Sequence, residues 1–70
     1  MSERLRYLRK ENNLSQRDLA TILHIKQNTY SQYENGKRQL PIELLIALAR
    51  FYNVSTDFIL GLTDNEDPYQ

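Results

Sequence analysis

The sequence predicts an all-α domain with a helix-turn-helix at its centre. Two short helical patterns, Gln16 to Leu23 and Gln27 to Asn35, are separated by only three residues, too few for a loop. A third pattern, from Pro41 to Tyr52, repeats apolar residues at the spacing of a helix that faces a core. At 70 residues the chain is near the lower size limit for an independent core. We expect one compact domain over 1–62 and a loose acidic tail over 63–70.

The first helix is expected to begin at Ser2, which can cap it, and to run to about Asn12. Leu5 and Leu8 then share the inward face. Glu3 lies in the first turn, where the helix dipole favours an anion.

The second helix is expected to be capped by Ser15, with Asp18 three residues later in a variant of the capping box. Leu19 and Leu23 form its apolar stripe, and Leu14 packs against Leu19 as a hydrophobic staple.

The third helix has an inward face with Tyr30 and Tyr33 and an outward face that is polar but uncharged. Solubility alone would favour Lys and Glu on that face. Amide side chains instead offer a donor and an acceptor together, which fits the N6/N7 edge of adenine in a DNA major groove. The candidate base-contacting residues are Gln27, Asn28, Ser31 and Gln32.

The fourth helix, opened by Pro41, has more apolar residues than one core face requires. The expected core face comprises Leu45, Leu48, Ala49 and Tyr52. The surplus comprises Ile42, Leu44, Ile46, Ala47 and Phe51. A dimer surface and packing against the chain termini explain this surplus equally well.

After a left-handed stop at Asn53, Ser55 is expected to cap a last short helix that runs through Leu60 and ends at Gly61. Phe58 anchors it together with Ile59. The residues chosen as a candidate dimer surface are Leu44, Phe51 and Phe58.

Composition narrows the function classes. There is no cysteine and only one histidine, so we expect no disulfide, no metal site and no cofactor, and an enzyme is disfavoured. No apolar run suits a membrane span or signal peptide, which favours a cytoplasmic location. Net charge is zero, but residues 1–38 hold eight Lys and Arg against four Asp and Glu, and residues 39–70 hold one against five. The basic half contains the helix-turn-helix, as nucleic-acid binding requires.

A set of short motifs carries a family resemblance: Leu14-Ser15-Gln16, Leu19-Ala20, Gln27-Asn28-Thr29, Tyr33-Glu34-Asn35-Gly36-Lys37-Arg38, Pro41, Leu45, Leu48, Ala49 and Asn53-Val54-Ser55. With these residues the sequence resembles the Cro/C1-type helix-turn-helix family of phage repressors and their bacterial relatives. The resemblance covers roughly residues 3 to 62. It implies a five-helix lambda-repressor-like fold.

The same resemblance implies an ion pair between Arg9 and Glu34, which would tie the first helix to the third. A buried pair would make the loss of one partner cost about 3–5 kcal/mol, whereas a solvated surface pair would contribute under about 1 kcal/mol. It also implies that Gln16 binds a DNA phosphate at a helix N-terminus. The residues assigned to phosphate contacts are Gln16, Arg17, Lys26, Thr29, Asn35, Lys37 and Arg38.

Two positions depart from the family pattern. His24 stands where Gly is usual, in a turn whose backbone is left-handed, and His tolerates that conformation better than most residues. Lys26 stands where Ser or Thr usually caps the third helix, which loses roughly 1 kcal/mol of capping but places a cation near phosphate.

The resulting hypothesis is a sequence-specific regulator of transcription, a repressor, that binds double-stranded DNA as a homodimer. The alternative is a protein-interaction module on the same fold, resembling an antitoxin or a coactivator, whose fourth and fifth helices bind a partner. Steep salt dependence of duplex binding separates the two.

Overall fold

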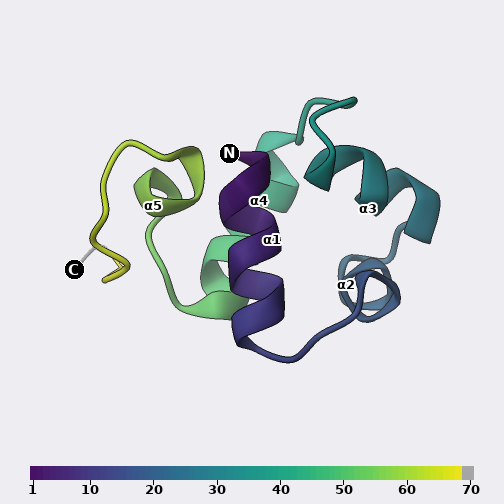
Figure 1. Cartoon of the computed structure of the whole chain (residues 1–70), viewed down its shortest axis with the longest axis horizontal. Helices are drawn as coiled ribbons and strands as arrows, with labels where there is room; N and C mark the ends of the chain where they lie inside the picture. Colours follow the sequence, from purple (N-terminus) through teal and green to yellow (C-terminus); the bar gives the residue numbers. More distant parts are fainter. Residues whose placement is uncertain (69–70) are drawn as a thin grey trace.

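The computed structural model describes residues 1–68, which form five α-helices and no strand (Figure 1). The predicted all-α, five-helix architecture is confirmed. The helices are α1 (Ser2–Glu11), α2 (Gln16–Leu23), α3 (Gln27–Glu34), α4 (Ile42–Tyr52) and α5 (Thr56–Leu60).

Helix α1 is the central element of the fold. It contacts α3 on one side and α5 on the other, while α2 packs on α3 and α4 packs on α5. Figure 1 shows α2 and α3 to the right of α1, α5 to its left and α4 behind it. One core joins all five helices. It comprises Leu5, Leu8, Leu19, Ala20, Leu23, Tyr30, Tyr33, Leu40, Leu48, Ala49, Val54, Phe58 and Ile59.

Left-handed residues end the helices and allow the short connections. Asn13, His24 and Asn53 follow α1, α2 and α4 with φ of 56°, 58° and 56°. Asn and His are among the few side chains that tolerate this region. Gly61 ends α5 with φ of 81°. The expected stops at Asn53 and Gly61 and the left-handed His24 are therefore confirmed.

The start of α1 differs from the prediction. Met1, not Ser2, occupies the N-cap position, and no side chain caps the helix. Ser2 is itself the first helical residue, and a cap requires the residue just outside the helix. Helix α3 ends at Glu34. Of the pair that follows, Gly36 has a positive φ and Asn35 stays right-handed with φ of −87°.

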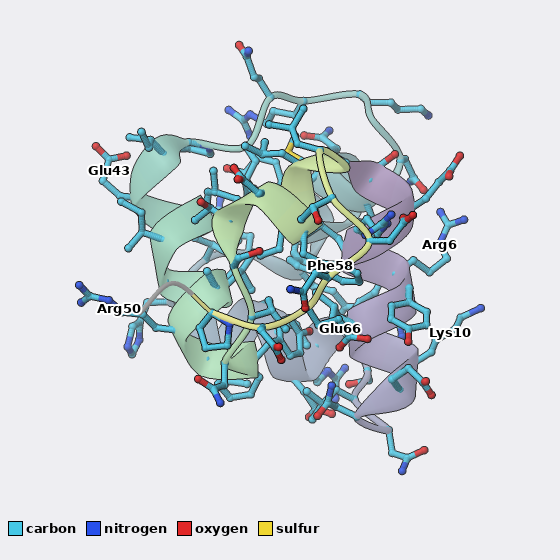
Figure 2. The ribbon with its side chains drawn as sticks, turned by 90° about the vertical axis from the view of Figure 1, so that its left-hand side faces the viewer. Arg6, Lys10, Glu43, Arg50, Phe58 and Glu66 are labelled. Atoms are coloured by element: carbon cyan, nitrogen blue, oxygen red, sulfur yellow. The ribbon has the colours of Figure 1, made fainter. Side chains whose placement is uncertain are left out.

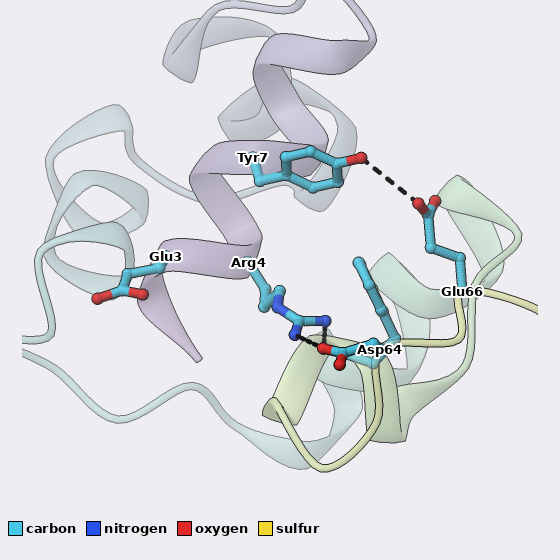
Figure 3. A pocket seen from close by; sticks show the side chains of 6 residues that line it. Glu3, Arg4, Tyr7, Asp64 and Glu66 are labelled. Carbon is cyan, nitrogen blue, oxygen red and sulfur yellow. Dashed lines mark hydrogen bonds and ion pairs between the residues drawn. The ribbon is translucent and has the colours of Figure 1, made fainter.

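The segment after α5 lies against α1 (Figure 3). Arg4 donates hydrogen bonds to the carbonyl oxygens of Phe58 at 3.2 Å and Thr63 at 3.1 Å, and to Asp64 Oδ1 at 2.9 Å. The Tyr7 hydroxyl donates to Glu66 at 3.4 Å. These side chains line a hollow of about 400 Å³. The looseness expected for 63–70 stays a prediction, and residues 69–70 lie outside the described residues.

Candidate nucleic-acid interface

The turn between α2 and α3 is fixed by backbone hydrogen bonds. The Ile25 N–H donates to the Ala20 carbonyl at 2.9 Å, and the left-handed His24 makes this return possible. The capping box predicted for α2 is present. Ser15 Oγ accepts from the Asp18 N–H at 3.0 Å, and Asp18 Oδ2 accepts from the Ser15 N–H at 2.8 Å. Those two hydrogen bonds lower the pKa of Asp18.

Lys26 occupies the N-cap position of α3 with extended backbone and no side-chain cap. The first N–H groups of α3 therefore have no side-chain acceptor from the cap residue and remain available to an anion.

Helix α3 separates its two faces as the sequence predicts. Tyr30 and Tyr33 are buried in the core. Gln27 and Asn28 are exposed, and Ser31 and Gln32 are half-buried. The four candidate base-contacting side chains thus lie on the side of α3 away from its buried residues.

Glu34 is the buried anchor of α3, with a side chain that is 0% exposed. Arg9 reaches it from α1 in a two-pronged contact: Nε donates to Oε2 at 2.7 Å and Nη2 donates to Oε1 at 3.2 Å. The remaining guanidinium nitrogen of Arg9, Nη1, donates to the Leu14 carbonyl at 3.0 Å. This geometry is the strong bidentate form of an arginine–carboxylate pair. The structure therefore brings Arg9 and Glu34 together in the buried form.

Gln16 is the third partner of this carboxylate. Its Nε2 donates to Glu34 Oε1 at 3.3 Å, so the free protein holds the amide over the ion pair. The amide oxygen takes no part in that hydrogen bond. A phosphate contact by Gln16 Nε2, which its assignment requires, would compete with Glu34 for the same donor.

The surroundings of Glu34 shift several pKa values. Burial opposes ionisation of Glu34, but hydrogen bonds from Arg9 and Gln16 outweigh it and leave the pKa lowered. The same carboxylate raises the pKa of Arg9. Burial raises the pKa of Tyr52 to about 12 and also raises that of Tyr30. Both tyrosine hydroxyls are buried, so neither is placed to contact DNA.

Exposed cations surround the outward face of α3. They are Arg17 in the first turn of α2, Lys26 before α3, and Lys37 and Arg38 after it. Within residues 1–68, none of the four makes an ion pair with a protein carboxylate. Lys37 and Arg38 line a groove of about 350 Å³ with Met1, Ser2, Tyr33, Gly36 and Gln39.

Two other residues assigned to phosphate contacts have neighbours of their own. Asn35 Oδ1 accepts from Arg6 Nη2 at 3.4 Å, and Asn35 Nδ2 donates to Ser31 Oγ at 3.3 Å. Thr29 is half-buried.

The candidate dimer surface is wrong at Phe58. That ring is only 5% exposed, because it packs in the core under the guanidinium of Arg4, 4.2 Å from its centroid. Leu44 is half-buried against the core, whereas Phe51 is 46% exposed.

Sequence reasoning missed Arg6 and Ser2. Arg6 lies one turn before Arg9 on α1, and its Nε is 3.7 Å from Glu34 Oε1. The three-residue spacing of the two arginines was the available signal. Ser2 comes near Lys37 and Arg38 only through the tertiary fold, for which the sequence carried no signal.

The described part of the chain lacks the features of two other kinds of site. Residues 1–68 contain no cluster of three or more potential metal-binding side chains. No helix in that range combines the length and apolar character needed to span a membrane.

Comparison with known proteins places the chain in a family. The helix-turn-helix family model matches residues 5–59. The chain is 46% identical to the uncharacterized HTH-type transcriptional regulator YobD of Bacillus subtilis over 94% of this chain and 59% of YobD. It is 38% identical to the cryptic phage CTXphi transcriptional repressor RstR of Vibrio cholerae over 76% of this chain and 48% of RstR.

A crystal structure of a transcriptional regulator from Listeria innocua has a similar fold. The TM-score is 0.82 at 33% identity, over 86% of this chain and 56% of the other. The chain thus spans about half the length of these relatives. The matched residues include the α2–turn–α3 unit and the helices that hold it. The chain belongs to the Cro/C1-type helix-turn-helix family.

Proposed function

We propose that this chain is a sequence-specific DNA-binding regulator of transcription that acts in the cytoplasm and represses by occupying an operator. In the proposed complex α3 lies in the major groove of double-stranded DNA, and two copies bind a pseudo-palindrome with half-sites about 34 Å apart. RstR, a relative, is named a transcriptional repressor, which supports repression over activation.

The observation that carries the proposal is the outward face of α3. The helix that carries these amides is fixed to α1 by the buried Glu34, which accepts two hydrogen bonds from Arg9. A rigid helix can present a fixed pattern of donors and acceptors to base edges. The exposed cations before and after α3 suit the phosphates on either side of a groove.

Residue roles follow from position along α3. Gln27 and Asn28, in the first turn, read base edges first, with Gln32 and Ser31 further along. Gln16, Arg17, Lys26, Thr29, Asn35, Lys37 and Arg38 contact phosphates. Gln16 does so by releasing Glu34 or by sharing its amide between the two acceptors.

Selection of random duplex DNA by the purified protein, sequenced at two salt concentrations, tests the proposal. A motif of two half-sites at a fixed spacing is the expected result. Weak retention of all sequences alike would contradict it.

Two substitutions separate base reading from phosphate binding. Gln27→Ala should lose about 1–3 kcal/mol at one base position and relax the preference there. Lys37→Ala should weaken binding to all sequences equally and flatten the salt slope by about one unit. Lys10→Ala, an exposed lysine of α1, is the charge-matched control and should change neither. An unchanged base preference in the Gln27→Ala protein would show that another residue reads the DNA.

One observation favours a second candidate, a module that binds another protein. Ile42, Ile46 and Phe51 are exposed on α4 by 65%, 42% and 46%. If the function lay there, duplex binding would be weak at any salt concentration, and substitutions on α3 would leave the activity unchanged.

A further inference from the structure

The outward face of α4 combines apolar side chains with one charge of each sign. Ile42, Ile46 and Phe51 are exposed there together with Ala47. Glu43 and Arg50 lie seven residues apart, which is two helical turns on nearly the same line. Figure 2 shows both charges extending from α4 on the side opposite α1. Neither makes an ion pair within residues 1–68.

This pattern is self-complementary about a point between Ile46 and Ala47. If a second α4 lies antiparallel against the first, Glu43 of each copy faces Arg50 of the other, and the two Ile46 side chains meet near the two-fold axis. A parallel pairing would instead place like charges opposite each other. The charge signs also suit the dipole of α4, but the dipole does not explain the apolar residues between them.

A groove beside Ile46 provides a second, independent match. It has a volume of about 460 Å³ and is lined by Ile46, Ala49, Arg50, Asn53, Val54, Thr56 and Pro68. In the antiparallel arrangement, the partner's α4 begins opposite the end of this α4. Ile42 of the partner, the most exposed apolar residue of that helix, then lies over the groove.

The arrangement also suits two DNA half-sites. In Figure 2 the outward face of α4 points to the left, and α3, which is on the right in Figure 1, lies on the far side. Suppose that a two-fold axis runs perpendicular to the page of Figure 2, just to the left of α4. Rotation about this axis places a second α4 antiparallel to the first. It leaves both α3 helices on the same far side, as binding to one face of a duplex requires.

We propose that this face of α4 binds a second copy of the same chain, in an antiparallel α4–α4 pair with reciprocal Glu43–Arg50 contacts. The inference deepens the proposed function, since it supplies the contact for the dimer proposed there. One helix face buries less than the roughly 1,600 Å² of a standard stable interface. The dimer is therefore weak in free solution and strengthened when DNA holds both copies.

Charge reversal tests this pairing without DNA. Glu43→Arg places two arginines opposite each other at both ends of the contact, and Arg50→Glu places two glutamates there. Each single variant should raise the dimer dissociation constant about 10- to 50-fold at low ionic strength. Mixing the two variants should restore dimers of one copy of each, because every facing pair is then opposite in sign. Sedimentation equilibrium at millimolar concentration measures all three samples.

An apolar pair of variants completes the design. Ile46→Asp should abolish dimerisation, whereas Ile22→Asp, an isoleucine of similar exposure on α2, should not. Circular dichroism melting checks that every variant folds, as expected for exposed positions.

Three results would overturn the proposal: a wild-type protein that stays monomeric at millimolar concentration, folded single variants that dimerise like wild type, or a mixture that stays monomeric. None of them touches DNA binding itself. Affinity of the wild-type protein for a single half-site tests that separately, and its absence would count against the proposed function instead.

Discussion

At the scale of single residues, the Arg9–Glu34 pair carries the largest expected effect. Arg9→Met leaves Glu34 as a buried charge without its main partner and should lower the free energy of unfolding by about 3–5 kcal/mol. The double variant Arg9→Met/Glu34→Gln should lose less than Arg9→Met alone, because no buried charge remains. Urea denaturation of the three proteins measures both values. Equal losses in the single and double variants would show that Glu34 is solvated.

Glu34 also predicts a pH dependence. Folding lowers its pKa below the ordinary value of 4.5, so the folded state binds that proton less readily than the unfolded state. The stability it contributes is therefore complete above about pH 4.5 and is lost as the pH falls through the folded value. The difference in unfolding free energy between wild type and Glu34→Gln should shrink below pH 4.5. Asp18→Asn is the control, because it removes another carboxyl whose pKa is lowered. In that background the difference made by Glu34→Gln should depend on pH in the same way.

At the scale of elements, two residues of the turn before α3 lower the stability of the fold: Lys26 does not cap the helix, and His24 has a left-handed backbone. Lys26→Ser should supply the missing N-cap of α3 and raise the unfolding free energy by about 1 kcal/mol. If Lys26 contacts phosphate, the same variant binds all duplexes more weakly. Thermal melting and binding at two salt concentrations measure the two effects. A lower melting temperature would mean that the lysine already stabilises the helix end.

A second prediction concerns the left-handed His24. His24→Val should destabilise the protein more than His24→Ala, because a β-branched side chain is least compatible with φ of 58°. His24→Gly removes that strain but adds freedom to the unfolded chain, so its effect should be under about 1 kcal/mol. Urea denaturation ranks the three variants. If all three lose equal stability, the imidazole itself makes the contribution.

How far the sequence predicts these elements depends on how local the signals are. Capping residues and the turn spacing act within a few residues, and α2 has the predicted bounds of Gln16–Leu23. Sequence reasoning assigned Phe58 both to the anchor of the last helix and to a dimer surface, and it could not choose between them because burial in the core depends on residues far away in the sequence, such as Arg4 at 54 residues. The interaction of Gln16 with Glu34 was missed for the same reason. Pairing across the fold leaves no periodic signature in a single chain.

At the scale of the whole molecule, Arg4 joins the two ends of the described chain. Arg4→Met removes its hydrogen bonds to Phe58, Thr63 and Asp64 and should free the segment after α5. Cleavage after Glu66 by a glutamate-specific protease should then become several-fold faster. Arg6→Met, on the same helix, should not accelerate it. Equally fast cleavage of the wild type would show that the segment is loose in solution, as the sequence suggested.

The central position of α1 has a consequence for biosynthesis. Its partners Glu34, Phe58 and Thr63 all come later in the chain. Because a ribosome releases the chain in order from its N-terminal side, α1 emerges before the residues that its arginines bind. The fold can therefore be completed only after nearly all of this domain has left the ribosome.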